Sequence, residues 1–162
     1  MKALIAFRSK YGTTARCAGL LSERIKAEVV LADLSKERRP SLATADVVLI
    51  GGSIYGGRIQ REVTALCDRE RPALLAKKVA LFICCLFTGE KAEAELESAF
   101  PDWLLAHAFS RACLGGELHP DRLSLFDKML AGGLGARGEV SALRMQEVDA
   151  LAAAVNGLLA AR

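Results

Sequence analysis

The sequence predicts a doubly wound α/β domain, with a five-stranded parallel sheet in the order 2-1-3-4-5 and helices on both faces. Short apolar runs of strand length alternate with segments whose apolar residues recur at helical spacing, which is typical of parallel strands joined by helices. Loops rich in glycine and serine follow two of these runs. The order 2-1-3-4-5 is taken from the common arrangement of such sheets. The length of 162 residues suits one domain, so we expect a single domain over residues 1–162.

In the first half of the chain, three apolar runs at residues 3–8, 28–34 and 46–51 are expected to be strands. The third contains four consecutive apolar residues, Val47–Ile50, as in parallel strands that are covered on both faces. Apolar residues recur at helical spacing after the first and third runs, at Cys17, Ala18, Leu21 and Ile25 and at Ile59, Val63, Leu66 and Cys67. These two segments are therefore expected to be helices.

In the second half, residues 78–86 are almost uninterrupted in their hydrophobicity and are expected to be the fourth strand. An acidic, alanine-rich helix follows at Glu90–Ala99, and a short helix begins near Pro101. Residues 111–118 are the expected fifth strand, weakened by two glycines. A helix around residues 123–130 and a glycine-rich loop at 132–138 come next. The last helix is expected to have one apolar face, formed by Met145, Val148, Leu151, Val155 and Leu158.

The charge and hydropathy of the chain argue against several classes of protein. The formal net charge is +3, and the one basic cluster, at Lys36, Arg38 and Arg39, is too small for a nucleic-acid partner. No stretch approaches the ~20 apolar residues that a membrane span needs. The apolar run near Met1 is expected to be the first strand rather than a signal peptide, so the expected location is the cytoplasm.

The cysteines are expected to be buried, reduced thiols. There are five, an odd number without metal-ligand spacing, and each lies in an apolar run. Two are adjacent in sequence, which makes them poor partners for one another. A redox role is the alternative, and no metal site is expected.

The loop after the first strand has the composition of a phosphate site. It consists of Ser9, Lys10, Tyr11, Gly12, Thr13 and Thr14. A turn of this kind directs unpaired backbone N–H groups and the positive end of a helix dipole at one point. Its hydroxyl groups can donate hydrogen bonds to phosphate oxygens, and glycine lets the backbone approach. An ordinary helix N-cap is the alternative.

The loop after the third strand, residues 51–57, combines an aromatic ring with four glycines. Its candidate contact residues are Ser53, Ile54, Tyr55, Gly56 and Gly57. Tyr55 offers a flat ring for stacking, and the glycines allow peptide groups to approach the edge of a flat ligand. A flavin requires this combination, because its N5 atom gains a proton on reduction and needs an acceptor. A flexible surface loop is the alternative.

The loop after the fourth strand is Leu86, Phe87, Thr88 and Gly89. Leu86 and Phe87 are apolar where a surface loop is normally polar. They either cover the second side of a bound ring or continue the core, and the sequence does not separate these two interpretations.

In these three loops the chain resembles the flavodoxins. Within that family, Gly51–Gly56 resembles the second loop of the group that includes menaquinone-dependent protoporphyrinogen IX dehydrogenase. Asp121–Met129 and Arg137–Val140, with Glu147 and Val148, are similar to the C-terminal part of that group. The resemblance implies that FMN is bound by all three loops and transfers one or two electrons. It also implies that the Gly56 peptide reorients to accept the hydrogen on reduced N5.

Two functions follow from this resemblance. The first is a flavin oxidoreductase of heme biosynthesis that resembles protoporphyrinogen dehydrogenase and passes electrons from a porphyrin to a quinone. The sequence pI of about 8.7, unlike that of the acidic flavodoxins, favours it. The second is an electron carrier that serves a redox partner and has no substrate of its own. No side chain is singled out as a catalytic acid or base, because the flavin supplies the chemistry.

A phosphoacceptor domain of the same topology is rejected, because Arg8-Ser9 and Gly51-Gly52 stand where it needs acidic residues. Both histidines, His107 and His119, are expected to have surface roles. A quinone substrate implies at most peripheral contact with a membrane. Five apolar residues could provide this contact: Leu123, Leu125, Phe126, Met129 and Leu130. Packing on the sheet is the commoner explanation for such residues.

Overall fold

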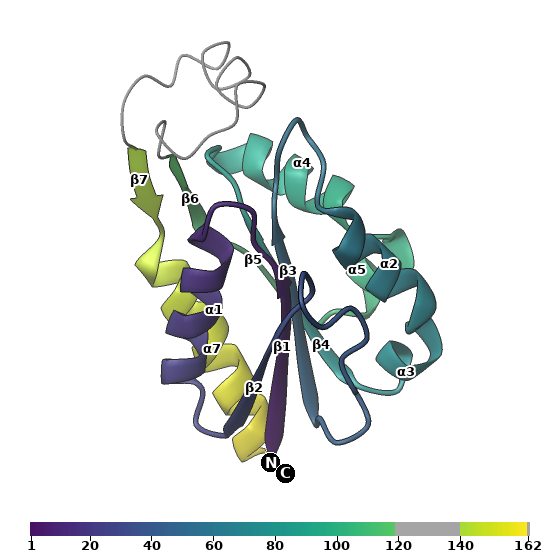
Figure 1. Ribbon diagram of the computed structural model, residues 1–162. Coiled ribbons are helices and arrows are strands. Elements are labelled where there is room, and N and C mark those ends of the chain that lie inside the picture. The colour runs from purple at the N-terminus through teal and green to yellow at the C-terminus, as the bar shows by residue number, and fades with distance from the viewer. Residues whose placement is uncertain (119–139, 162) are drawn as a thin grey trace.

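A computed structural model describes residues 1–118 and 140–161, and its main sheet confirms the predicted class and strand order (Figure 1). Five parallel strands lie in the order β2-β1-β3-β4-β5. Their bounds are β1 Lys2–Arg8, β2 Glu28–Asp33, β3 Val47–Ser53, β4 Lys78–Cys84 and β5 Ser110–Cys113.

The central strand β3 explains the continuous apolar run. Every residue of β3 is buried, because β1 and β4 flank it and helices cover both of its faces. In the register, Val48 lies opposite Leu4 of β1 and Val79 of β4, so that apolar side chains form rows across the sheet.

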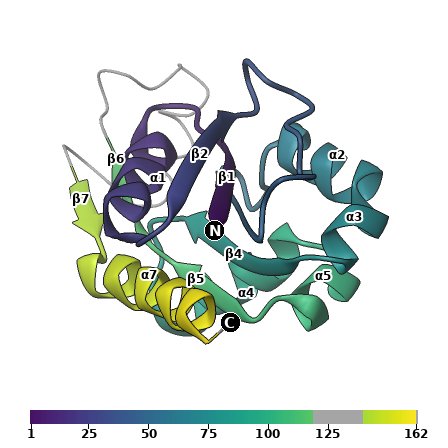
Figure 2. The same ribbon diagram turned by 90° about the horizontal axis from the view of Figure 1, so that it is seen from below.

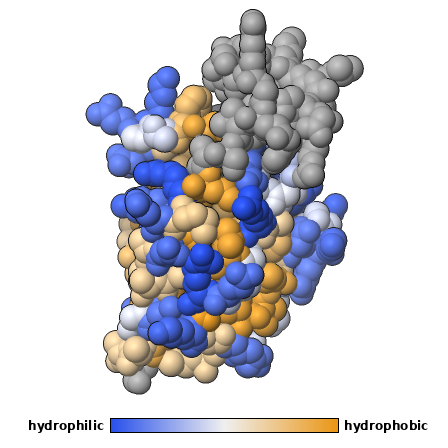
Figure 3. All heavy atoms as spheres, turned by 90° about the vertical axis from the view of Figure 1, so that its left-hand side faces the viewer, coloured by the Kyte–Doolittle hydropathy of each residue, from blue (hydrophilic) through white to orange (hydrophobic). Residues whose placement is uncertain are grey.

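Helices cover both faces of the sheet (Figures 1 and 2). On one face lie α1 (Thr13–Arg24) and α7 (Met145–Ala160), which pack against each other. Figure 3 views the molecule from this side, where hydrophilic side chains surround apolar surface. On the other face lie α2 (Arg61–Arg69), α3 (Arg71–Leu75), α4 (Gly89–Ala99) and α5 (Asp102–His107). In the described part of the chain, no helix is long and apolar enough to cross a membrane.

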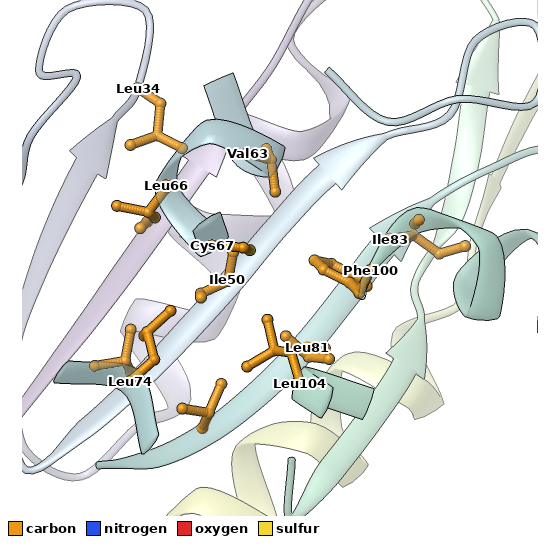
Figure 4. Packing of buried hydrophobic residues seen from close by; sticks show 14 of the residues in the cluster. Leu34, Ile50, Val63, Leu66, Cys67, Leu74, Leu81, Ile83, Phe100 and Leu104 are labelled. Carbon is orange, nitrogen blue, oxygen red and sulfur yellow. The ribbon is translucent and has the colours of Figure 1, made fainter. Parts of the chain in front are cut away.

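The core consists of two apolar clusters, one on each face of the sheet. Figure 4 shows the cluster between the sheet and α2, α3 and α5, where Ile50 and Leu81 of the strands meet Leu66 and Leu104 of the helices. All four side chains are fully buried. Because a buried leucine or isoleucine contributes about 1.5–3 kcal/mol, these two layers account for much of the driving force for folding.

The last helix buries most of the face predicted for it, with one correction. Val148, Leu151 and Val155 are buried, and Leu158 is partly buried against the same cluster. Met145, the first residue of the helix, is 37% exposed. Leu159 instead completes the buried face at the other end.

The predicted fifth strand is wrong in its second half. Its first half is β5, but residues 115–118 form β6 (Gly115–Leu118), which pairs with β7 (Val140–Leu143) in an antiparallel ribbon. Gly115 has φ +81°, a left-handed conformation that redirects the chain. Gly116 then packs on the Cys85 carbonyl, where a Cβ atom would lie 2.9 Å away. The predicted helix at 123–130 and loop at 132–138 lie outside the described residues.

The loops that follow the strands and the two ends of the described chain lie at opposite ends of the sheet. The loops that follow β1, β3 and β4 lie at the carboxyl end of the strands, at the top of Figure 1. Met1 and the end of α7 lie at the opposite end. There Asn156 accepts a hydrogen bond from the Lys26 N–H and donates one to the Arg24 carbonyl, which fixes α7 to the turn between α1 and β2.

Candidate functional site

The loop after β1 leads into α1, whose N-cap residue is a glycine and therefore supplies no side-chain cap to the first N–H groups of the helix. Gly12 is the residue before α1, with φ +101°, and no atom lies within 4 Å of the position that a Cβ would take. The Gly12 N–H donates to Ser9 Oγ at 3.1 Å, which closes the turn. The start of α1 thus combines unsatisfied donors with an open approach, as an anion site requires.

The threonines of this loop face inward. Thr14 is fully buried, and its Oγ1 lies 2.5 Å from Ser53 Oγ, so the loop after β1 is joined directly to the end of β3. Thr13 Oγ1 donates to Glu117 Oε2 of β6 at 3.5 Å. Both hydroxyl groups, which are candidates for phosphate binding, therefore have partners within the protein.

The loop after β3 is a tight hairpin. Tyr55 and Arg58 exchange two backbone hydrogen bonds of 3.0 and 3.1 Å across Gly56 and Gly57. The two glycines have φ +56° and +72°, the pattern of a type I′ turn. Both glycines are exposed with open space around them, so their peptide groups are accessible to a ligand.

An aromatic and cationic cluster joins the first two loops. The rings of Tyr11 and Tyr55 meet edge to face, with centroids 5.4 Å apart and an interplanar angle of 76°. The Lys10 ammonium lies 5.1 Å from the centroid of the Tyr11 ring and 5.3 Å from that of Tyr55. Flat rings and a positive charge are therefore brought together beside the two glycines of the hairpin.

The loop after β4 is joined to the second loop by the Ile54 N–H, which donates to the Cys84 carbonyl at 3.0 Å. Phe87 is half-buried against the core, and the Lys91 ammonium lies 5.3 Å from its ring centroid. Leu86 reaches Gly116 of β6. Of the two interpretations left open, the packing of Phe87 favours continuation of the core. The other two residues of the loop, Thr88 and Gly89, are exposed.

Two residues that the sequence analysis did not select lie in this region. Glu117 forms an ion pair with Arg16 in addition to its bond with Thr13, so a carboxylate stands beside the start of α1. Gln60 accepts a hydrogen bond from the Ser53 N–H at 3.0 Å, while its buried Nε2 has no partner among the described residues. No local sequence signal identifies Glu117, because it lies on β6 of the β6–β7 ribbon, which was not predicted.

The other candidate residues lie away from this region. His107 is partly buried, and its Nε2 lies 2.8 Å from the Lys77 carbonyl, so it has a structural contact rather than a purely surface role. His119 lies outside the described residues. All five cysteines are free and buried, as predicted.

Comparison with known proteins agrees with the fold. A family model described as a flavodoxin domain matches residues 4–132. The chain belongs to this flavodoxin-domain family. No protein in the curated set matches the chain.

Solved flavodoxins resemble this family member over almost its whole length. A flavodoxin from the domain Archaea has 17% identity and a TM-score of 0.53, with 99% of each chain covered. A flavodoxin of Streptococcus pneumoniae TIGR4 has 14% identity and a TM-score of 0.54, with 98% of this chain and 99% of that chain covered. At these identities the resemblance shows the fold.

A longer protein contains the same fold. Rubredoxin oxygen:oxidoreductase of the anaerobe Desulfovibrio gigas has 15% identity and a TM-score of 0.58. The match covers 99% of this chain but only 36% of that one, so the flavodoxin-domain chain spans about a third of its length.

Proposed function

We propose that this chain binds FMN at the three loops and transfers electrons through it. The observation that carries the proposal is the joining of an uncapped, glycine-led helix start to a paired-tyrosine cluster and a two-glycine hairpin. The helix start suits a phosphate, and the tyrosine cluster suits a flat ring. The hairpin glycines suit a ring edge that exchanges a proton. The residues present fit the group, and FMN would supply one- and two-electron chemistry there.

The phosphate would bind at the start of α1. The unsatisfied N–H groups of its first turn and the helix dipole attract a dianion, and Gly12 leaves room for it. The Lys10 ammonium lies close enough to the tyrosine rings to offset negative charge that develops on a reduced ring.

The flavin ring would be oriented by the hairpin after β3. Tyr55 supplies a ring for stacking, and the Gly56 peptide supplies the carbonyl that accepts the hydrogen on reduced N5. Two adjacent glycines are suited to this role, because peptide reorientation requires φ values that other residues adopt only at a cost.

For the reaction, we propose an oxidoreductase that resembles menaquinone-dependent protoporphyrinogen IX dehydrogenase, located in the cytoplasm with at most peripheral membrane contact. The resemblance at Gly51–Gly56 and the basic pI of about 8.7 support it. The second candidate is an electron carrier without a substrate of its own. The near-complete mutual coverage with flavodoxins from Archaea and Streptococcus pneumoniae favours this second candidate.

Cofactor binding is tested by titrating the purified protein with FMN and, separately, with riboflavin, which lacks the phosphate. We expect the flavin absorption to saturate at one equivalent of FMN, and riboflavin to bind at least fivefold more weakly, because a phosphate at a helix start contributes about 1 kcal/mol or more. Absence of saturable FMN binding would contradict the proposal. Equal affinity for the two flavins would exclude the phosphate site at α1.

The two candidate functions are separated by turnover. The FMN-loaded protein is mixed with protoporphyrinogen IX and a soluble menaquinone analogue, and porphyrin fluorescence is followed. An oxidoreductase produces porphyrin catalytically, at a rate proportional to protein concentration. A carrier produces none, although it still exchanges electrons with small redox dyes.

A further inference from the structure

Two of the buried cysteines, Cys85 and Cys113, lie side by side at the carboxyl end of the sheet. Cys113 ends β5 opposite Ile83 of β4, and Cys85 lies two residues beyond Ile83, on the same face. Their Sγ atoms are 3.2 Å apart. A disulfide needs a separation of about 2.05 Å, so a movement of about 1.2 Å, within the range of side-chain rotation, would join them.

A second pair of thiols provides an internal comparison. Cys17 of α1 and Cys84 of β4 have Sγ atoms 3.6 Å apart on the other face of the sheet. These side chains are 0% and 3% exposed, against 5% for Cys85 and 9% for Cys113. Proximity is thus similar in the two pairs, and Cys113 is the most exposed of the four thiols.

Cys113 lines a cavity of about 370 Å³ along the open edge of β5. The cavity lies between α4 and the start of α7, and its charged lining residues are Glu93, Glu97, Arg111, Arg144 and Glu147. Glu93 and Glu97 lie on α4, Arg111 lies on β5, and Arg144 pairs with Glu147 at the start of α7. Charges of both signs suit a small molecule that itself carries both. Such a molecule can reach Cys113 before it reaches Cys85, which is not part of the lining.

The surroundings of Cys113 favour its thiolate. The hydrogen bond with Cys85 lowers the pKa of Cys113, and the Gly115 N–H and the Arg144 guanidinium lower it further, which outweighs the opposing effect of burial. The pKa of Cys85 is raised by the same pairing and by burial. Because Cys113 lines the cavity and Cys85 does not, Cys113 is the nucleophile of the pair and Cys85 the resolving thiol.

We propose that Cys113 and Cys85 form a dithiol centre that reduces small peptide disulfides with carboxylate and ammonium groups, bound in the cavity beside β5. The Cys113 thiolate attacks one sulfur of the disulfide, which forms a mixed disulfide and releases the first thiolate. The Cys85 sulfur then attacks Cys113 Sγ, and its proton passes to the second departing sulfur. Two protein thiols lose two electrons, and one small disulfide becomes two thiols.

This centre needs no electrons from FMN, so it goes beyond the proposed flavin chemistry. The test uses the protein as purified, with glutathione disulfide as the probe. Intact mass and alkylation of the unfolded products are measured. We expect the wild-type mass to fall by two hydrogen atoms, the alkylatable thiols to fall from five to three, and peptide mapping to join Cys85 to Cys113.

Variants identify each step. Cys85→Ser should stop at a glutathione adduct on Cys113, because the resolving thiol is absent, and Cys85→Ala repeats the test with a different replacement. Cys113→Ser should give neither an adduct nor a disulfide. Cys17→Ala is the matched control and should react like the wild type. Circular dichroism verifies that every variant is folded before it is used.

Three outcomes would overturn the proposal. One is an unreacted wild-type protein, and another is a stable glutathione adduct that wild type does not resolve. The third is a disulfide that maps to Cys17 and Cys84. Because flavin absorption is not part of the measurement, none of these results would bear on FMN binding.

Discussion

Gly56 has a backbone conformation that few other residues adopt. Its φ of +56° places it in the left-handed region, and its surroundings leave space for a methyl group. The reason for glycine is thus the backbone rather than packing. A side chain at this position would both strain the free protein and restrict the peptide that we propose to face the flavin.

We predict that Gly56→Ala lowers the free energy of unfolding by about 1 kcal/mol, the lower end of the cost of a left-handed conformation. It should also weaken FMN binding, as measured by flavin fluorescence. Gly157→Ala is the control, because Gly157 lies in α7 with open space and no positive φ. It should raise stability by roughly 0.5–1 kcal/mol in urea unfolding. Equal effects of the two substitutions would exclude backbone strain at Gly56.

The Thr14–Ser53 hydroxyl pair is buried and joins two loops of the site. We predict that Thr14→Val lowers the free energy of unfolding by about 1–3 kcal/mol, because it leaves the Ser53 hydroxyl buried without this partner. Thr64→Val, at an exposed position of α2, should change stability little. The double variant Thr14→Val/Ser53→Ala should recover part of the loss. A double variant less stable than either single variant would contradict this explanation.

At the scale of elements, the β6–β7 ribbon contributes a negative charge to the proposed phosphate site. Glu117 of β6 pairs with Arg16 and Thr13 of α1. Its carboxylate would repel a phosphate at the helix start, while its hydrogen bonds position the two α1 side chains. These effects act in opposite directions on FMN affinity, and Coulomb repulsion between two anions in a half-buried site is the larger one.

We predict that Glu117→Gln tightens FMN binding several-fold in a fluorescence titration, and that this gain shrinks at high salt. Glu62→Gln is the matched control. Glu62 pairs with Arg8 at the same end of the sheet. It should leave the affinity for FMN nearly unchanged. Weaker binding by Glu117→Gln would show that the positioning effect dominates.

The same ribbon marks the limit of prediction from sequence. The parallel strands were predictable because each is a short apolar run, and β3, the most continuous of them, is buried along its whole length. The turn at Gly115 and the pairing of β6 with β7 depend on contacts between segments more than 20 residues apart in the chain, such as Gly116 with Cys85. Composition alone gives no signal of that kind.

In the candidate site too, some residues could be predicted from the sequence and others could not. The loop residues Gly12, Tyr55 and Gly56 were recognisable because their chemistry is local. Their partners were not, because the hydroxyl bond between Thr14 and Ser53 and the contact of Glu117 with α1 arise only after folding. The thiol pairs were missed for the same reason, since adjacency in sequence does not reveal proximity across neighbouring strands.

At the scale of the whole molecule, positive charge is concentrated near the proposed site. Arg38, Arg39, Arg61 and Arg69, with Glu62, line a hollow of about 440 Å³ between the loop after β2 and α2. One end of this hollow, at Arg61, is at the start of α2, which follows the loop after β3. A local positive potential attracts anions and increases their rate of encounter with the site.

We therefore predict that the reduced, FMN-loaded protein is oxidised by ferricyanide at a rate that falls several-fold as ionic strength rises. Arg38→Glu/Arg39→Glu should slow this oxidation in stopped-flow measurements at low salt. Lys26→Glu/Lys78→Glu changes the net charge equally, but at the opposite end of the sheet, and should have a smaller effect. Equal slowing by the two double variants would mean that net charge, rather than the arginine cluster, governs the rate.

Both ends of the described chain lie at the amino end of the strands, far from the three loops (Figure 1). A tether at Met1 or after α7 would therefore hold the molecule with its loops directed away from the point of attachment. On an electrode, this orientation places the proposed flavin on the solution side, where a dissolved partner can reach it, and lengthens the path from the electrode surface. Attachment through an engineered cysteine near the hairpin after β3 would reverse this geometry and shorten that path.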